Sequence, residues 1–243
     1  MKVLVVGESC QDIFMYGEVK RLEPSAPVPV IKINNTIKNP GMAMNVAQNL
    51  LSLDVSYEIV TNSNWKYLNK TRIVEEKVNH MFLRVDQETT YMKLNRDSLK
   101  LSNYGAVIIS DYDKGFLSKE DIQYICSHHP LVFLDTKKSI GKWCECATYI
   151  KINEAECKNA DKITDSLKEK LIVTAGSKGA EHLGKTYPVQ QCDIKDLSGA
   201  GDTFLAGLVA NYIETKDMDR AIEFANECAT RVVQKQGVST IDD

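Results

Sequence analysis

The chain has 243 residues, 43% hydrophobic and 26% charged, which is ordinary for a folded globular protein and enough to bury one sizeable core. Lysine and arginine number 30 against 33 acidic residues, so the net charge of −3 gives no reason to expect nucleic acid or an anionic membrane as a partner. No run of about 18 apolar residues occurs. Met1 and Lys2 lead directly into a strand-like run without the pattern of a signal peptide, so we expect a cytoplasmic protein.

The seven cysteines are odd in number and scattered along the chain, which favours free thiols. Cys144 and Cys146, with Cys126 or Cys157, could bind zinc. The paired Cys-x-x-Cys or histidine spacing that is typical of zinc sites is missing, so structural zinc is not favoured.

Short apolar runs alternate with helical segments, which predicts an α/β fold with a parallel sheet and right-handed crossovers. The expected strands are Lys2–Val6, Val55–Val60, Ala106–Ser110, 131–134 and Lys170–Thr174. Ligands of open α/β sheets bind at the carboxyl ends of the strands, so Asp12, five residues after Gly7, is placed to bind a polar substrate. A turn-forming aspartate is the alternative.

Two segments depart from this alternation and predict a small β-sheet lid. Residues 14–38 contain three prolines and then alternate apolar with polar residues, as an edge strand or flap does. His80–Asp86 and Thr89–Leu94 are β-prone runs that we expect to pair across a short polar turn. One apolar face of this lid must be covered by substrate or by another subunit.

Between the two lid segments, residues 39–51 form a turn that enters an apolar helix. Gly41 would let the backbone approach a ligand, and the Asn45 amide offers a hydrogen-bond donor and an acceptor to a polar ligand.

Later in the chain, Asn153 and Glu156 have the spacing of a helix capping box, with Asn153 as N-cap. The same amide and carboxylate could hold Mg²⁺ through water, and Lys151 could neutralise charge on a phosphoryl group. Both interpretations of Asn153 and Glu156 can hold at once.

Gly179–Thr186 matches the P-loop pattern GxxxxGK[ST] letter for letter. A P-loop needs a helix that opens at the Lys-Thr end, whereas Pro188 follows Thr186 by two residues and no helical period follows. We therefore predict a β-hairpin that turns at residues 183–185.

A glycine-rich polar turn, Asp196–Asp202, runs into an apolar helix over residues 203–210. The first amides of such a helix have no internal partner and favour an anion, and Gly199 and Gly201 leave them accessible. Asp202 beside that anion site could take a proton from a nucleophile. Alternatively, Asp202 is an ordinary acidic residue in a helix first turn and the glycines only allow a tight turn.

These motifs carry a resemblance. Asp-Leu-Ser-Gly-Ala-Gly-Asp-Thr-Phe at 196–204 resembles the C-terminal signature of ribokinase-like (PfkB) carbohydrate kinases. Arg21–Val30, Asp111-Tyr112 and Gly115 are similar to the pattern of bacterial heptose-7-phosphate kinases. The chain departs from the family at Met42, where a second glycine is usual, at Met44, where a small residue is usual, and in a strand–helix unit missing after Val60.

The resemblance implies a ribokinase-like three-layer α/β/α sandwich with a mostly parallel central sheet. The whole of residues 1–243 would be one kinase domain, with lid segments at about 14–38 and 78–95. The implied activity is transfer of the γ-phosphate of ATP to a hydroxyl of a sugar or sugar phosphate, with a heptose-7-phosphate-like acceptor favoured. Mg²⁺ is the implied cofactor, K⁺ an additional one, and a homodimer through the lid is the implied assembly.

The resemblance also implies roles for individual residues. Asp202 would be the catalytic base and the amides of Gly199, Ala200 and Gly201 the anion hole. Asp12, Gly41 and Asn45 would bind the sugar. The nucleotide would meet Lys151, Asn153, Glu156, Thr174, Gly176, Gly179 and Asn226, the last on a helix over residues 218–233. Asn153 and Glu156 would hold Mg²⁺ through water, and Asp196 and Ser198 a monovalent cation.

Two alternatives stay open: a catalytically silent sugar or nucleotide sensor with the same fold, suggested by Met42, Met44 and the missing unit, and a nucleoside kinase. A dinucleotide-binding oxidoreductase is not favoured, because no GxGxxG follows the first strand.

Overall fold

The protein is described by a computed structural model that covers residues 1–87 and 91–242. Its main sheet has eight strands in the order β12-β11-β10-β9-β8-β7-β1-β4. These strands are β1 (Val3–Gly7), β4 (Tyr57–Val60), β7 (Ala106–Asp111), β8 (Val132–Thr136), β9 (Tyr149–Asn153), β10 (Leu171–Thr174), β11 (Ala180–His182) and β12 (Lys185–Tyr187).

The six strands from β4 to β10 are parallel, and only β11 and β12 run antiparallel to their neighbours. All six parallel strands therefore end at the same edge of the sheet. Strands β1, β7 and β8 are buried along their whole length, as expected of strands covered on both faces. The predicted α/β fold with a mostly parallel sheet is confirmed.

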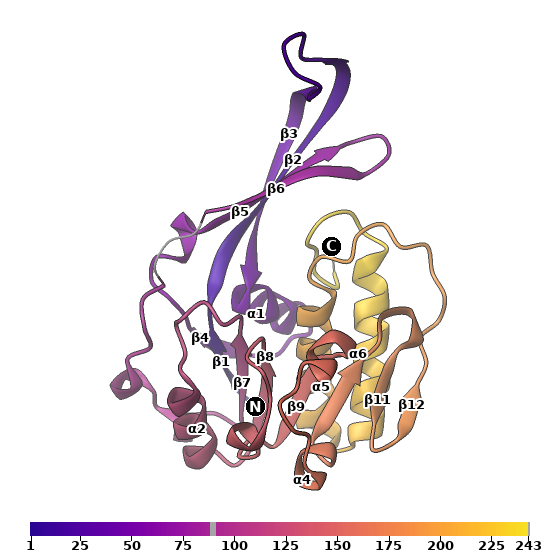
Figure 1. The fold of residues 1–243 in the computed structure, drawn as a ribbon. Coiled ribbons are helices and arrows are strands. Elements are labelled where there is room, and N and C mark those ends of the chain that lie inside the picture. Colours follow the sequence, from indigo (N-terminus) through magenta and orange to yellow (C-terminus); the bar gives the residue numbers. More distant parts are fainter. Residues whose placement is uncertain (88–90, 243) are drawn as a thin grey trace.

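Helices cover both faces of this sheet (Figure 1). On one face α1 (Ala43–Ser52), α5 (Ala200–Thr215) and α6 (Met218–Val233) pack on alternate side chains of the strands, including Val3, Val5 and Ile108. On the other face α2 (Lys119–His128) and α4 (Asp165–Lys168) pack on the side chains between them, such as Leu4 and Val6. The remaining short helices are α3 (Glu154–Lys158), η1 (Trp65–Tyr67), η2 (Arg96–Ser98), η3 (Leu101–Asn103), η4 (Lys142–Cys144) and η5 (Gly176–Lys178).

The predicted helix starts and turns follow local chemistry. Ser118 and Asp121 have the three-residue spacing of a capping box in the sequence, and they form a reciprocal capping box at the start of α2. Leu183 and Gly184 both have positive φ, and they turn the β11–β12 hairpin in place of a P-loop. No helix in the described ranges is long and apolar enough to cross a membrane.

A second sheet of four strands, the lid, projects from the body in the order β3-β2-β5-β6 (Figure 1). It consists of β2 (Ser9–Leu22), β3 (Pro29–Met42), β5 (Asn69–Glu75) and β6 (His80–Asp86). Strand β2 begins two residues after β1 ends, so the carboxyl edge of the main sheet continues directly into the lid. Residues 61–68, with only η1 as a helix, join β4 to β5.

The predicted pairing within the second lid segment is wrong. His80–Asp86 pairs with β5, a strand that the sequence analysis did not assign, and residues 91–94 form no strand. Residues 89 and 90 lie outside the described residues. Strand β5 was not predicted because its first four residues are the polar Asn69, Lys70, Thr71 and Arg72, so no apolar alternation is visible along it.

Gly7 provides a test of how tightly the strands approach at the carboxyl edge. A Cβ at this position would lie 1.9 Å from the carbonyl oxygen of Ser110, a backbone atom that cannot move aside. We expect Gly7→Ala to lower the free energy of unfolding by roughly 1–3 kcal/mol, measured by urea denaturation. Gly141→Ala is the matched control, because its nearest neighbour would be 3.6 Å away. Equal stabilities of the two variants would contradict the close approach at Gly7.

Candidate active site

Asp202 lies in the first turn of α5 with only 7% of its surface exposed. Asn45 donates a hydrogen bond from Nδ2 to Asp202 Oδ2 at 3.0 Å, and the Tyr112 hydroxyl donates to Oδ1 at 2.6 Å. Burial raises the pKa of Asp202 above its usual range, and these two hydrogen bonds act in the opposite direction by stabilising the charged form. The carboxylate is thus fixed in one orientation.

The turn before α5 forms a site for an anion. Gly199 is the N-cap with a left-handed φ of 83°, and α5 begins at Ala200. A side chain at Gly199 would collide with the Asn45 amide, 2.7 Å from the Cβ position, and one at Gly201 would crowd Lys151 Nζ at 3.0 Å. Both glycines therefore admit polar groups to the helix N-terminus, where amides and the helix dipole attract negative charge.

Lys151, the middle residue of β9, reaches this helix start. Its ammonium group is buried and donates to Asp135 Oδ2 at 2.7 Å. At the end of the same strand, Asn153 and Glu156 form the predicted capping box, with both hydrogen bonds at 2.8 Å. The second oxygen of Glu156 pairs with Lys137.

A cavity of about 360 Å³ opens onto Asp202 beneath the lid. Its lining is strongly basic: five lysine and arginine side chains face two carboxylates. The basic residues are Lys70, Arg72, Arg84, Lys114 and Lys137, and the acidic ones are Asp12 and Asp202. Such a cavity suits a ligand that carries several negative charges.

Asp12 stands on the wall of this cavity and forms an ion pair with Arg72 of β5. Gly41 on β3 leaves room for the Asp12 carboxylate, because a Cβ at Gly41 would lie only 2.1 Å from Asp12 Oδ2. Gly41 and Asn45 are not among the residues that line the cavity. They act on it through Asp12 and Asp202 respectively.

The turn that carries Tyr112 is held from below by Glu8. This fully buried carboxylate accepts hydrogen bonds from the amides of Tyr112, Lys114 and Phe116 at 2.8, 3.1 and 3.2 Å. Burial and the nearby Asp111 raise the pKa of Glu8. Glu8 immediately follows β1, so the first strand of the main sheet fixes the turn after β7.

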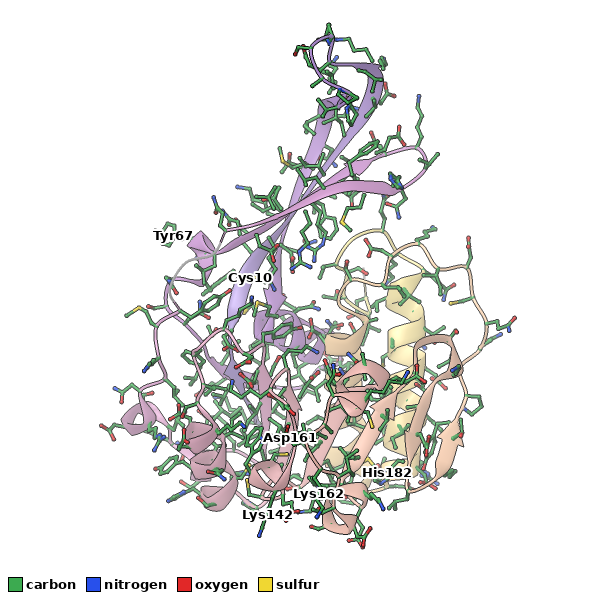
Figure 2. All side chains as sticks on the ribbon, viewed as in Figure 1. Cys10, Tyr67, Lys142, Asp161, Lys162 and His182 are labelled. Carbon is green, nitrogen blue, oxygen red and sulfur yellow. The ribbon has the colours of Figure 1, made fainter. Side chains whose placement is uncertain are left out.

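A neighbouring cavity of about 260 Å³ shares Lys70 and Lys114 with the first one. Cys10, which also lines it, lies where the lid strands leave the body (Figure 2). Lys142, Asp161 and Lys162 are at the opposite end of the molecule. The two cavities therefore occupy the junction between lid and body.

A third cavity, of about 380 Å³, lies on the other side of the α5 N-terminus. Four of the predicted nucleotide-binding residues line it: Thr174, Gly176, Gly179 and Asn226. Ala200 and Gly201 also line it, so the same helix start borders this cavity while Gly199 and Asp202 border the basic one. Asn226 is held in place by a hydrogen bond from Nδ2 to the Tyr187 carbonyl at 2.8 Å.

Asp196 ties the turn before α5 to the C-terminal loop. Its two carboxylate oxygens accept hydrogen bonds from the amides of Ser198 at 2.8 Å and Gly237 at 3.1 Å. In the same C-terminal loop, the buried Ser239 hydroxyl has no hydrogen-bond partner among the described residues. A buried hydroxyl without a partner is uncommon in a folded protein and calls for an explanation.

Met42 has a φ of 62°, a backbone conformation that residues with side chains rarely adopt. Its buried side chain lies on the cavity lining and packs with Cys10 and Leu68 in a small cluster that Tyr91 and Tyr112 complete. Contacts under the basic cavity thus stabilise the strained backbone of Met42.

The sequence analysis assigned no role to Tyr112 or to the five basic residues of the cavity. A signal existed for some of them: Tyr112 and Lys114 lie in the polar turn after a predicted strand, and Lys137 follows another. Lys70 and Arg72 alternate on one face of β5, with Arg84 opposite Arg72 in β6, but this alternation has no meaning until β5 is known to be a strand.

Residues 95–243 match the model of a family described as pfkB family carbohydrate kinase. Among curated proteins, the chain is 32% identical over 298 residues to the "Bifunctional protein HldE" of Helicobacter pylori strain J99. That alignment covers 97% of this chain but 63% of the relative, so the chain spans less than two thirds of the length of that protein.

Solved structures share the fold at low identity. Arabidopsis thaliana ribokinase complexed with ribose and ATP aligns with a TM-score of 0.70 and 17% identity, covering 99% of this chain and 94% of the other. Phosphofructokinase-2 from Escherichia coli in complex with potassium gives a TM-score of 0.70 and 13% identity, with 99% and 95% covered. These similarities confirm the ribokinase-like fold.

Proposed function

Because the chain belongs to the pfkB family of carbohydrate kinases, which transfer phosphoryl groups to sugar hydroxyls, we propose that its substrates are ATP and a phosphorylated sugar. The observation that carries this proposal is the cavity at Asp202, lined by five basic side chains against two carboxylates. A neutral sugar needs hydroxyl partners, whereas a phosphate ester needs positive charge to offset its loss of hydration. A heptose 7-phosphate or a sugar phosphate of similar length is the acceptor that we favour.

Asp202 is the proposed base. Its carboxylate faces the basic cavity from the helix start that also borders the proposed nucleotide cavity, so an acceptor hydroxyl and a terminal phosphate can meet there. Asp202 takes the proton as the hydroxyl oxygen attacks the γ-phosphorus of ATP, and the bond from that phosphorus to the bridging oxygen breaks to release ADP. The amides of Gly199, Ala200 and Gly201 and the ammonium group of Lys151 stabilise the negative charge that spreads over the transferring group.

The residues proposed for Mg²⁺ fit that ion by their chemistry. Asn153 and Glu156 present an amide and a carboxylate oxygen, the hard ligands that Mg²⁺ prefers, and both oxygens are already fixed by the capping box. No cluster of three or more acidic, histidine or cysteine residues that could hold a metal forms in the described ranges, so contact through water is the fitting mode. When bound, Mg²⁺ neutralises phosphate charge. For K⁺, support comes from the unsatisfied Ser239 hydroxyl, which lies two residues after Gly237, the residue whose amide bonds to Asp196.

The base assignment is tested by measuring ADP release from Mg-ATP with heptose 7-phosphate, fructose 6-phosphate, ribose and adenosine, with and without K⁺. We expect turnover with a phosphorylated acceptor and a loss in kcat of about 10²–10⁴-fold in Asp202→Asn, because the proton acceptor is removed. Nucleotide binding should persist. Asp193→Asn, an exposed aspartate in the preceding loop, is the control. Near-normal turnover in Asp202→Asn would show that Asp202 is not the base.

The phosphate preference is tested at Lys70, which lines both cavities beneath the lid. We expect Lys70→Met to raise the KM for the phosphorylated acceptor about 10-fold or more, because a charge-assisted contact is lost, and to leave the KM for ATP unchanged. Lys66→Met is the matched control, since Lys66 is an exposed lysine of η1. An equal loss with the unphosphorylated sugar would contradict recognition of the acceptor phosphate by Lys70.

We also propose that the lid pairs two copies of the chain. All seven residues of β6 are exposed, and this strand is at the edge of its sheet. Met81, Leu83 and Val85 alternate along it and are 50%, 53% and 44% exposed, an unusual apolar edge for a protein that remains a monomer.

The mass in solution tests this pairing. Sedimentation should give about twice the 27.3 kDa of one chain, and Leu83→Glu should restore the single-chain mass by placing charge in the interface. Val78→Glu, at an exposed apolar residue of the β5–β6 turn, is the control. A wild-type protein of single-chain mass would exclude the dimer.

A further inference from the structure

We propose that Tyr112 is a positioning residue for Asp202: its hydroxyl holds the carboxylate in the one orientation that faces the acceptor cavity. This inference rests on the proposed role of Asp202 as the base. The hydrogen bond from the Tyr112 hydroxyl to Oδ1 is 2.6 Å long, shorter than the 3.0 Å bond that Asn45 gives to Oδ2. Each carboxylate oxygen keeps a second lone pair, so a substrate hydroxyl can still donate to Asp202.

The tyrosine ring is fixed from several sides. Lys70 Nζ is 5.2 Å and Lys137 Nζ 5.6 Å from the ring centroid, and Met42 belongs to the apolar cluster against which the ring packs. The backbone amide of Tyr112 is bonded to Glu8. These contacts determine where the hydroxyl lies before any substrate arrives.

This packing gives a reason for a residue with a side chain at position 42, despite its strained backbone. A glycine at position 42 would relieve the positive φ but would remove one of the three buried side chains of the cluster against which Tyr112 packs.

The hydrogen bond also controls ionisation. A donor to the charged form favours that form, so the Tyr112 hydroxyl keeps the pKa of Asp202 lower than burial alone would set it. Burial and the Asp202 charge raise the pKa of Tyr112 itself well above its usual range, so the hydroxyl stays protonated and remains a donor. Without it, Asp202 would hold its proton to a higher pH.

Other charged groups face Asp202 and remain in a Tyr112 variant. Asp135 of β8 raises the pKa of Asp202 by repulsion, and Lys151 of β9 lowers it. Lys137, after β8, interacts with Asp202 as well. These three residues approach from the strands beneath α5.

Further charged groups line the cavity from the lid: Asp12 of β2, Lys70 and Arg72 of β5 and Arg84 of β6. Lys114, in the turn after β7, lines it from the body. Cys10 of β2 is close enough for the Asp202 charge to act on it, and burial raises the pKa of its thiol to about 12, so it is neutral at ordinary pH. Because Tyr112→Phe changes none of these groups, a change in Asp202 ionisation reports the lost hydroxyl.

The first test follows Asp202 directly and needs no acceptor. Carbon-13 NMR of protein with labelled aspartate carboxyls gives the pKa of Asp202, whose signal is assigned as the one that Asp202→Asn removes. In Tyr112→Phe we expect the pKa of Asp202 to rise by roughly one unit, because a hydrogen bond to the charged form is lost. The control is Tyr212→Phe. Tyr212 lies further along α5, and its hydroxyl is hydrogen-bonded to that of Tyr149, so its removal should leave the pKa of Asp202 unchanged.

The second test is the pH profile of kcat/KM with the acceptor identified in the ADP-release panel. Activity needs ionised Asp202 and falls as pH decreases through its pKa, so this acidic limb should move to higher pH in Tyr112→Phe by the same amount as the NMR pKa. An unchanged Asp202 pKa in folded Tyr112→Phe would overturn the proposal. Failure of the panel itself would count against the proposed function only, since the titration decides the role of Tyr112 without turnover.

Discussion

Keeping a charged carboxylate out of water is the constraint on which the centre of this molecule depends. Asp202 is almost fully buried, and an isolated carboxylate in such a place would take up a proton. The structure offsets this tendency with two hydrogen bonds, with the N-terminus of α5 and with the nearby Lys151 ammonium group. Helix α1, the turn after β7 and strand β9 each supply one of these partners, so the Asp202 carboxylate links elements from across the sheet.

The parallel sheet explains why these partners meet. Strands β1, β7, β8, β9 and β10 all end at one edge. Glu8, Tyr112 and Lys137 directly follow β1, β7 and β8, and Asn153 and Thr174 are the last residues of β9 and β10. The chain leaves this edge in two ways: β2 continues outward into the lid, and α5 begins beneath it. Cavities of different character result on the two sides of the α5 N-terminus, a basic one and one bordered by Phe204, Ala229 and Val233.

The lid supplies positive charge to the basic cavity as well as covering it. Lys70, Arg72 and Arg84 come from β5 and β6, and with Lys114 and Lys137 from the body they make the cavity basic. Arg72 also neutralises Asp12, so this carboxylate is kept beside the cavity without repelling an anion. A protein with a net charge of −3 therefore presents local positive charge where a phosphorylated acceptor would bind.

The sequence by itself determined the features that depend on neighbouring residues: the apolar runs of the parallel strands, the capping boxes at Ser118 and Asn153, the β11–β12 hairpin, and the glycine-rich turn that leads into α5. Each of these arises within a few residues, where period, caps and turn chemistry operate. Only the tertiary structure decided the pairing of β5 with β6, the contact of Tyr112 with Asp202 and the basic lining of the cavity. These bring together residues such as Arg72 and Asp12 that are 60 positions apart, and their partners are chosen by how the sheets pack, which no local pattern records.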